Sequence, residues 1–505
     1  MNVYYPQKRI NNMQKFILTI DQGTTSSRAI LFDKKSHIFA EFQKEVHCFY
    51  PKPGWVETDA EEIYKSVIEC IKGVLKQSST SFDDIDSVAI TNQRETTVIW
   101  NKDTCKPISR AIVWQSRQTN NICKCYKNKI KTIHKKTGLI LNPYFSASKI
   151  RFILDHSKNA QHLAEEGKLL FGTIDSWLIY KLTGGVVHAT DVTNASRTML
   201  FNLKDLCWDE ELCSLFNIPM KMLPKIKECS DDYGIINNND LKTELHITGV
   251  IGDQQASLFG HTCFKTGDCK NTYGTGCFML MNVGNEPILS KKGLLTTVAW
   301  KLNGIVTYAL EGSVFIGGAA IQWLRDGLKI IKDASESEKR ALKAENTENL
   351  YVVPAFVGLG TPYWDDDARG SILGITRSTS DNQIIKATLE GIAYQCQDVF
   401  LAMEQETHIS LNEIQVDGGA SKNNYLMQFQ SDICQKDIMI PQVFETTALG
   451  AAYVAGLFTG FFSNLNAIKL THNYSSIFNP SIDKLEANKK YKGWKKAIKA
   501  TLNFE

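Results

Sequence analysis

Two strand–turn–strand patterns of similar design, one in each half of the chain, constrain the fold more than any other feature of the sequence. In the first pattern, strands predicted at residues 16–20 and 27–32 flank the turn Asp-Gln-Gly-Thr-Thr-Ser. In the second, strands predicted at residues 268–272 and 277–282 flank the turn Tyr-Gly-Thr-Gly. Short glycine-containing turns between apolar strands are typical of β-hairpins. The repeated hairpin therefore predicts two related halves.

The rest of the chain alternates between helical and strand patterns. Helices are predicted at residues 60–76, 319–331, 381–404 and 425–435, and further strands at residues 87–91 and 413–416. Strands interleaved with helices favour the α/β class. We place the boundary between the halves near Gly260. This division gives an N-terminal extension of residues 1–15, an N-terminal domain of residues 16–260 and a C-terminal domain of residues 261–505.

Composition and charge narrow the range of functions. The chain is 43% hydrophobic and 22% charged, so it can bury a large core. Its length of 505 residues exceeds what one hydrophobic core usually organises, which predicts more than one domain. The formal net charge of +3 is too balanced for a protein that binds nucleic acid or a membrane surface. No segment approaches the ~20 continuous apolar residues of a membrane span, and residues 1–15 lack the apolar core of a secretory signal. The 13 cysteines include no Cys-x-x-Cys pair, which indicates reduced thiols and a cytoplasmic location. We expect small-molecule partners.

The turn of the first hairpin carries groups that suit a bound phosphate. Gly23 lets backbone N–H groups approach an anion, and Asp21 is a candidate to hold Mg²⁺ through water. The short donors and the positive charge of this turn are Thr24, Thr25, Ser26 and Arg28. Taken alone, the same residues more often make an ordinary turn.

A third glycine-rich turn follows the strand predicted at residues 413–416. Its sequence is Asp-Gly-Gly-Ala-Ser-Lys-Asn at residues 417–423. The glycines let the backbone pass close to a nucleotide base or sugar, and Asn423 can hydrogen-bond to it. Paired glycines at a strand end are also common in turns without function. Three such turns in one chain are harder to explain in that way.

Several motifs resemble the carbohydrate kinase family of the actin-like ATPase superfamily, which includes the glycerol kinases. They are Asp-Gln-Gly-Thr-Thr-Ser-Ser-Arg at 21–28, Asn-Gln-Arg-Glu at 92–95, Gly-Asp-Gln-Gln-Ala at 252–256, Tyr-Gly-Thr-Gly-Cys-Phe at 273–278 and Asp-Gly-Gly-Ala at 417–420. The likeness runs in order from about Phe16 almost to the C-terminus. It implies two ribonuclease-H-like domains flanking a central catalytic cleft, with ATP held mainly by the second domain and a polyol by the first.

The resemblance also implies a reaction and the residues that perform it. The reaction is the ATP-dependent phosphorylation of glycerol to sn-glycerol 3-phosphate by in-line transfer, with Mg²⁺, and Asp253 resembles the general base. The positions that resemble glycerol-binding residues are Arg94, Glu95, Trp114, Tyr144, Asp253, Gln254 and Phe278. Those that resemble ATP contacts are Thr24, Thr25, Ser26, Arg28, Thr275, Gly318, Gln322, Gly419 and Asn423, with Asp21 as the candidate metal ligand. Relatives are often dimers or tetramers, which implies a homodimer or homotetramer.

Two other functions compete with glycerol phosphorylation. One is a kinase for another small polyol or ketose, and the other is a catalytically silent ATP-binding regulator or chaperone-like ATPase. Asp21, Asp253 and Thr275 are all present, which disfavours a silent protein. Pentulose and hexulose kinases of the superfamily generally differ at the substrate positions, which favours glycerol. Taken alone, Arg94 and Glu95 are also compatible with a surface ion pair.

Overall fold

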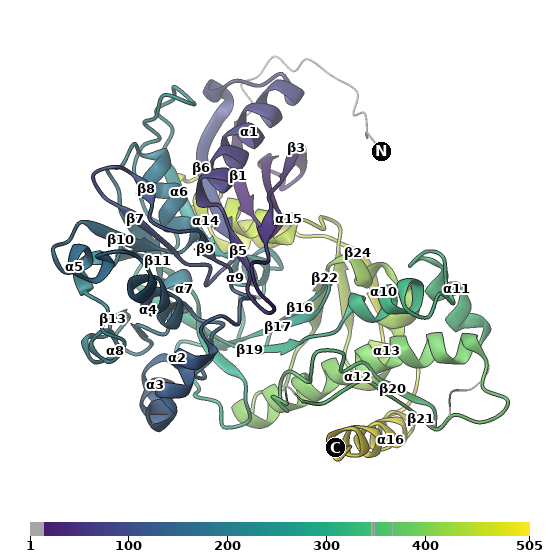
Figure 1. Cartoon of the computed structure of the whole chain (residues 1–505). Coiled ribbons are helices and arrows are strands. Elements are labelled where there is room, and N and C mark those ends of the chain that lie inside the picture. Colours follow the sequence, from purple (N-terminus) through teal and green to yellow (C-terminus); the bar gives the residue numbers. More distant parts are fainter. Residues whose placement is uncertain (1–14, 345–346, 348, 366, 505) are drawn as a thin grey trace.

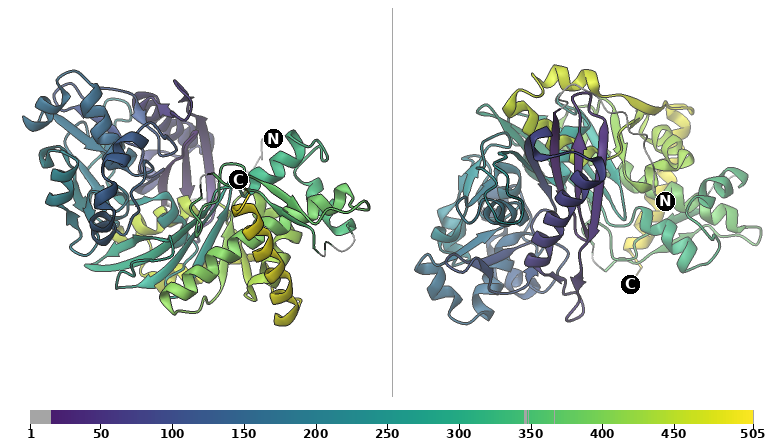
Figure 2. Two further views of the ribbon diagram at one scale, coloured as in Figure 1. Left: turned by 60° about the horizontal axis from the view of Figure 1, so that its bottom comes forward. Right: turned by 90° about the horizontal axis from the view of Figure 1, so that it is seen from above.

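The computed structural model describes residues 15–344, 347, 349–365 and 367–504. Residues 1–14 of the expected N-terminal extension therefore lie outside the described residues. A five-stranded sheet organises the first half of the chain and a seven-stranded sheet the second half. The two halves lie side by side, as Figures 1 and 2 show.

The first sheet has the order β15-β6-β1-β2-β3. Its strands are β1 (Phe16–Gln22), β2 (Ser26–Phe32), β3 (Ile38–Glu45), β6 (Ile85–Asn92) and β15 (Ile247–Gly252). β1, β2 and β3 are antiparallel neighbours, whereas β6 runs parallel to both β1 and β15. The predicted first hairpin is thus confirmed as β1 and β2.

The second sheet has the order β18-β19-β17-β16-β22-β23-β24. Its strands are β16 (Cys269–Tyr273), β17 (Cys277–Gly284), β18 (Leu295–Leu302), β19 (Ile305–Val314), β22 (Ile414–Asp417), β23 (Ile438–Pro441) and β24 (Tyr474–Phe478). β16, β17 and β19 repeat the antiparallel order of β1, β2 and β3, and β16, β22 and β23 repeat the parallel order of β1, β6 and β15. This shared topology confirms the two ribonuclease-H-like halves, and β18 and β24 extend the second sheet.

Strand β1 shows why apolar residues build this architecture. Alternate side chains of a strand point to opposite faces of the sheet. Ile17 belongs to the buried cluster that continues into the second half of the chain and includes Leu280. Leu18 and Ile20 belong to a separate cluster that contains Ile63 of helix α1. Both faces of β1 are therefore covered, as expected for a central strand that pairs with a parallel neighbour.

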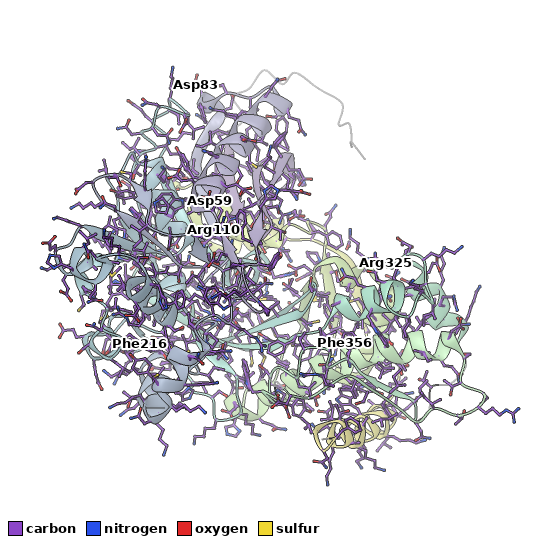
Figure 3. The ribbon with its side chains drawn as sticks, viewed as in Figure 1. Asp59, Asp83, Arg110, Phe216, Arg325 and Phe356 are labelled. Atoms are coloured by element: carbon purple, nitrogen blue, oxygen red, sulfur yellow. The ribbon has the colours of Figure 1, made fainter. Side chains whose placement is uncertain are left out.

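The predicted helices are present as α1 (Ala60–Ser78), α10 (Gly318–Asp326), α12 (Asp381–Thr407) and α13 (Asn424–Cys434). Asp59 caps α1 by accepting a hydrogen bond from the backbone N–H of Glu61 at 2.9 Å, and Figure 3 labels Asp59 and Asp83 near the two ends of this helix. α10 ends five residues earlier than residue 331, its predicted limit, because Gly327 follows it, packed closely against the Trp323 side chain.

Further helices and short strands occur in the rest of the described chain. The further helices include α2 (Asn120–Cys125), α3 (Ile130–Thr137), α4 (Ser146–His156), α5 (Ala160–Glu165), α6 (Ile174–Leu182), α7 (Val192–Ala195), α8 (Glu210–Leu215), α11 (Glu336–Lys343), α15 (Leu465–Thr471) and α16 (Lys484–Leu502). The short strands are β4 (Cys48–Phe49), β5 (Glu57–Thr58), β7 (Val98–Asn101), β8 (Lys106–Pro107), β9 (Ala111–Ile112), β10 (Leu169–Gly172), β11 (Ala189–Asp191), β12 (Phe201–Asn202), β13 (Cys207–Trp208), β14 (Lys225–Lys227), β20 (Tyr351–Val353) and β21 (Ser371–Leu373). Within the described ranges, no helix combines the length and apolar character needed to cross a bilayer.

Two helices from different halves of the chain pack unusually closely at the centre of the molecule. They are α9 (Asp253–Gly260) and α14 (Thr446–Thr459), and α14 lies beside β1 and α9 in Figure 1. A Cβ atom on Gly260 would lie 1.9 Å from the Thr446 carbonyl oxygen, and one on Gly450 would lie 1.9 Å from that of Ala256. Glycine at both positions lets the backbones approach, and this contact fixes the helix that begins at Asp253.

Candidate active site

Two charged side chains meet where neighbouring parallel strands end. Arg94 follows β6, and Asp253 follows β15, whose Gly252 is paired with Asn92. Because parallel strands end at the same edge of a sheet, both side chains project from one edge. Arg94 Nε lies 3.0 Å from Asp253 Oδ1. Gly252 makes this contact possible, since a Cβ there would lie 2.9 Å from the Arg94 side chain.

Glu95 does not pair with its neighbour Arg94. Its backbone has a φ of 61°, in the left-handed region that few residues other than glycine adopt. Lys149 Nζ stabilises this conformation by donating to the carbonyl oxygens of Glu95 at 3.1 Å and Tyr144 at 2.6 Å. Burial lowers the pKa of Lys149 to about 7. The turn sends the Glu95 carboxylate to Arg197, whose Nε donates to Glu95 Oε1 at 2.6 Å.

A fourth charge, Glu311 of β19, closes these contacts into one buried network. Its Oε2 accepts a hydrogen bond from Arg94 Nη1 at 2.6 Å, and its Oε1 accepts one from Arg197 Nη2 at 2.9 Å. Burial opposes the charged form of Glu311, but Arg197 and Arg94 outweigh it and lower the pKa of Glu311 to about 2. The network links loops of the first half to a strand of the second half. Arg94 and Glu95 are therefore buried and paired with other residues, so the surface ion pair is excluded.

Three aromatic rings stand beside these charges. The Trp114 ring makes edge contacts with Tyr144 and Phe278, with centroid distances of 5.5 Å and 6.5 Å. Trp114 Nε1 donates to Thr24 Oγ1 at 2.9 Å, which ties the aromatic group to the turn of the first hairpin. The three aromatic residues predicted to contact the substrate are thus brought together, although they come from three separate parts of the sequence.

The first hairpin turn presents its hydroxyl groups between β1 and β2. Asp21 and Arg28 are cross-strand partners, and Arg28 Nη2 donates to Asp21 Oδ2 at 2.6 Å. Arg28 also pairs with Glu445 at the start of α14. The Asp21 carboxylate is therefore shared with Arg28. No cluster of three or more His, Cys, Asp or Glu side chains suited to a metal occurs in the described part of the chain.

The second hairpin turn packs against a glycine pair that opens α10. The backbone N–H of Gly318 donates to the Gly274 carbonyl at 2.8 Å, and that of Gly317 donates to the Thr275 carbonyl at 2.8 Å. A Cβ on Gly318 would lie 2.8 Å from the Gly274 carbonyl oxygen. Thr275 and Gln322, which follow on the two segments, are both exposed.

The third glycine-rich turn, residues 417–423, lies against the turn of the second hairpin. Gly418 has a φ of 88°, and a Cβ there would lie 2.6 Å from the Tyr273 carbonyl oxygen. No atom lies within 4 Å of a Cβ on Gly419, so its outer side is open. Asn423 caps α13 by accepting the N–H of Leu426 at 2.9 Å and donates to Ser337 Oγ at 3.1 Å. The predicted contact of Asn423 with a nucleotide stays a prediction.

Asp253 is the carboxylate of this site with the properties of a base. Its side chain is 30% exposed, whereas that of Arg94 is 2% exposed. Burial raises the pKa of Asp253 to about 6; Arg94 and Lys270 oppose the rise, and Glu95 adds to it. A carboxylate with this pKa is ionised at neutral pH and still accepts a proton readily.

Comparison with known proteins assigns the chain to a family. Residues 16–260 match the N-terminal domain of the FGGY family of carbohydrate kinases, and residues 269–458 match the C-terminal domain of the same family. The chain is an FGGY carbohydrate kinase.

Individual relatives of this FGGY kinase match it along almost its whole length. It is 54% identical over 97% of its length to a glycerol kinase from Oceanobacillus iheyensis, of which 99% is covered. It is 53% identical over 98% of its length to a glycerol kinase from Staphylococcus epidermidis, also covered to 99%. The crystal structure of Plasmodium falciparum glycerol kinase with ADP has a TM-score of 0.93 at 37% identity, covering 97% of this chain and 99% of that one. The expected resemblance is confirmed.

Arg197 and Glu311 of this FGGY kinase were missed in the sequence. Arg197 lies in a turn after α7 and Glu311 lies within an apolar strand, so neither belongs to a recognisable motif. A charged residue inside an otherwise apolar strand is the one signal by which Glu311 could have been found.

A cavity of about 170 Å³ lies apart from the predicted site. Its lining includes Lys386, Glu390 and Tyr425 and none of the predicted site residues.

Replacing Glu311 tests the buried network. Glu311→Gln leaves Arg94 and Arg197 without a shared carboxylate, and removing one partner of a buried pair costs about 3–5 kcal/mol. We expect a loss of this size in the free energy of unfolding, measured by urea denaturation at pH 7. Because the folded-state pKa of Glu311 is lowered to about 2 from 4.5, its contribution is present above pH 4.5 and disappears towards pH 2.

The control for Glu311→Gln is Glu228→Gln. Glu228 pairs with Lys301 at 3.4 Å and its side chain is 25% exposed, so we expect a loss below about 1 kcal/mol. Equal effects of the two substitutions would show that Glu311 stabilises the fold no more than a partly exposed ion pair does.

Proposed function

We propose that this FGGY kinase transfers the γ-phosphoryl group of ATP to a terminal hydroxyl of glycerol and forms sn-glycerol 3-phosphate. One observation carries the proposal: Arg94, Glu95 and Asp253 converge at the edge of the first sheet, beside a cluster of aromatic rings. A three-carbon polyol needs charged groups for its hydroxyls and an apolar surface for its carbon chain. The high identity to relatives named glycerol kinase supports the same substrate.

In the proposed complex, the site distinguishes polar from apolar parts of glycerol. Arg94 donates to hydroxyl oxygens, and Glu95 accepts from hydroxyl hydrogens. Trp114 and Phe278 cover the carbon backbone, and the Tyr144 hydroxyl provides a further polar contact. Both Arg94 and Glu95 are already fixed by ion pairs of 2.6 Å, so glycerol binds a preformed arrangement with little loss of side-chain entropy.

Asp253 acts as the general base of the proposed reaction. It accepts the proton of the reacting hydroxyl while the oxygen attacks the γ-phosphorus in line with the departing ADP oxygen. Arg94 keeps Asp253 ionised by its positive charge at 3.0 Å. Burial raises the basicity of Asp253 above that of an ordinary aspartate.

The hairpin turns hold ATP in this proposal. The N–H and hydroxyl groups of the first turn and of Thr275 approach the phosphates, and the open side of Gly419 receives the nucleoside. The ADP in the structure of the Plasmodium falciparum relative supports a nucleotide in this fold. Residues 16–260 then bind glycerol mainly, and residues 261–505 bind ATP.

In the proposed donor complex, Asp21 would hold Mg²⁺ through water. Mg²⁺ in kinases is usually held by one or two carboxylates together with waters and substrate phosphates. Asp21 fits a contact of this kind. Its Oδ2 accepts a hydrogen bond from Arg28, so Oδ1 is left to contact a metal-bound water. The ion neutralises phosphate charge when it is bound.

The cysteine residues bear on where the protein is located in the cell. All 13 cysteines are free, which fits a reducing compartment that also supplies ATP, so we propose the cytoplasm. A homodimer or homotetramer remains a prediction.

The proposed substrate is tested by measuring initial rates with ATP and glycerol, dihydroxyacetone, erythritol or xylulose in a coupled ADP assay. We expect the largest kcat/KM for glycerol, because relatives named glycerol kinase match this chain along almost its whole length. A higher kcat/KM for xylulose would show that the chain is a ketose kinase. ADP release at a rate that none of these acceptors increases would contradict phosphoryl transfer to a polyol or ketose.

Replacing Asp253 tests the proposed base. Asp253→Asn should lower kcat roughly 10²- to 10⁴-fold, the usual contribution of a general base, and leave ADP affinity unchanged by calorimetry. Asp326→Asn is the control, since Asp326 pairs with Arg325 on the surface at 2.7 Å. An Asp253→Asn variant that keeps most of its turnover would exclude this role.

The pH dependence of the wild type tests the same base. The kcat/KM for glycerol should be constant above pH 7 and fall tenfold per pH unit below about 6, because the base must be ionised.

A further inference from the structure

Lys270 is a buried charge of the active site that no motif or proposed step has used. It lies on β16, and its relative exposure is 0%. Its Nζ donates to Gln254 Oε1 at 2.5 Å and to Thr272 Oγ1 at 2.9 Å. Gln254 directly follows the proposed base, so Lys270 of the second sheet contacts the first turn of α9.

Lys270 is held in place by charges on both sides. Burial lowers the pKa of Lys270, and the carboxylates of Asp417, Asp253 and Glu311 oppose this effect, whereas Arg94 adds to it. Asp417 belongs to the third glycine-rich turn, and its strand pairs Asp417 with Thr272. A buried ammonium group is stable only where hydrogen bonds and opposite charges compensate for lost hydration. Lys270 thus has a fixed position between the polyol residues and the nucleotide turn.

The contact with Lys270 determines which way the Gln254 amide faces. An ammonium group has three donors and no acceptor, so only the amide oxygen can face it. The amide nitrogen then points away from Lys270 and presents N–H groups. The neighbouring Asp253 carboxylate is ionised and only accepts hydrogen bonds. Adjacent residues of α9 therefore have opposite hydrogen-bond polarity.

We propose that Lys270 is a positioning residue that fixes the Gln254 amide so that its N–H donates to a glycerol hydroxyl oxygen while Asp253 accepts a hydroxyl proton. The inference rests on the proposed function and adds a determinant of how glycerol is oriented. Without Lys270, the Gln254 amide can rotate and present its oxygen to the substrate. Gln254 and Asp253 then both accept hydrogen bonds from glycerol hydroxyl groups. The reacting hydroxyl can donate to either residue and is no longer directed to the base.

The test compares KM and kcat of Lys270→Met with the wild type. Methionine keeps most of the side-chain length and removes the donors. We expect KM for glycerol to rise roughly 2- to 10-fold, the range for losing a hydrogen bond between neutral groups. We also expect kcat to fall, because the reacting hydroxyl is no longer directed to Asp253, and KM for ATP to change less than twofold. The control is Lys301→Met on β18, a partly exposed lysine that pairs with Glu228 at 3.4 Å; both KM values should stay unchanged.

A double-mutant cycle with Gln254→Leu separates positioning from a general effect on the fold. If Lys270 acts through Gln254, the two single variants and the double variant have similar KM values for glycerol. Additive effects, or equal changes in KM for glycerol and ATP, would overturn the inference. So would an unchanged KM for glycerol.

A second variant covers the case in which Lys270→Met does not fold. Thr272→Val removes one of the two hydrogen-bond partners of Lys270 Nζ but keeps the charge and Gln254, so we expect KM for glycerol to rise several-fold with a smaller loss of stability than in Lys270→Met. An unchanged KM in this variant would overturn the inference. Wild-type protein without glycerol turnover would instead overturn the proposed function, and the inference would fall with it.

Discussion

The arrangement of the active site depends on the buried ion pairs that join Arg94, Glu95, Arg197 and Glu311. Two guanidinium groups and two carboxylates lie almost fully buried, at distances of 2.6–2.9 Å along the chain of contacts. Each charge compensates for the lost hydration of its neighbours, so removing one member takes a buried opposite charge away from those that remain. Since Glu311 belongs to the second sheet and the others to loops of the first half, the pairs also fix how the halves meet.

These fixed ion pairs suit the proposed binding of a small polyol with little rearrangement of the site. Charged groups that already have partners keep their orientation when the substrate enters, and electrostatic preorganisation of this kind is a major source of catalysis. The close packing of α9 against α14 has the same effect on Asp253, because α9 begins at that residue. The Trp114 contact with Thr24 connects the aromatic group to the turn of the first hairpin, so the proposed glycerol and phosphate sites are joined by a hydrogen bond.

The sequence predicted the repeated hairpins and most of the candidate site. The residues that it did not predict make contacts between distant parts of the chain. Alternating apolar residues and glycine turns are local signals, so the two hairpins, their halves and most helix positions were predictable. Arg197 and Glu311 are paired across 114 residues, and Arg94 and Glu311 across 217, and no local pattern records such contacts. Lys270 resembles an ordinary polar residue of a strand until its burial is known. The adjacent Arg94 and Glu95 were also compatible with a surface ion pair, but the left-handed backbone of Glu95 directs their side chains to different partners.

A crystal structure of the protein with glycerol and a non-hydrolysable ATP analogue tests most directly whether the buried ion pairs form a preorganised site. A terminal hydroxyl of glycerol should lie within hydrogen-bonding distance of Asp253 and point to the γ-phosphate, with the four ion-paired residues keeping their present partners. Glycerol bound elsewhere, or a change of partners such as Glu311 releasing Arg94, would contradict the account.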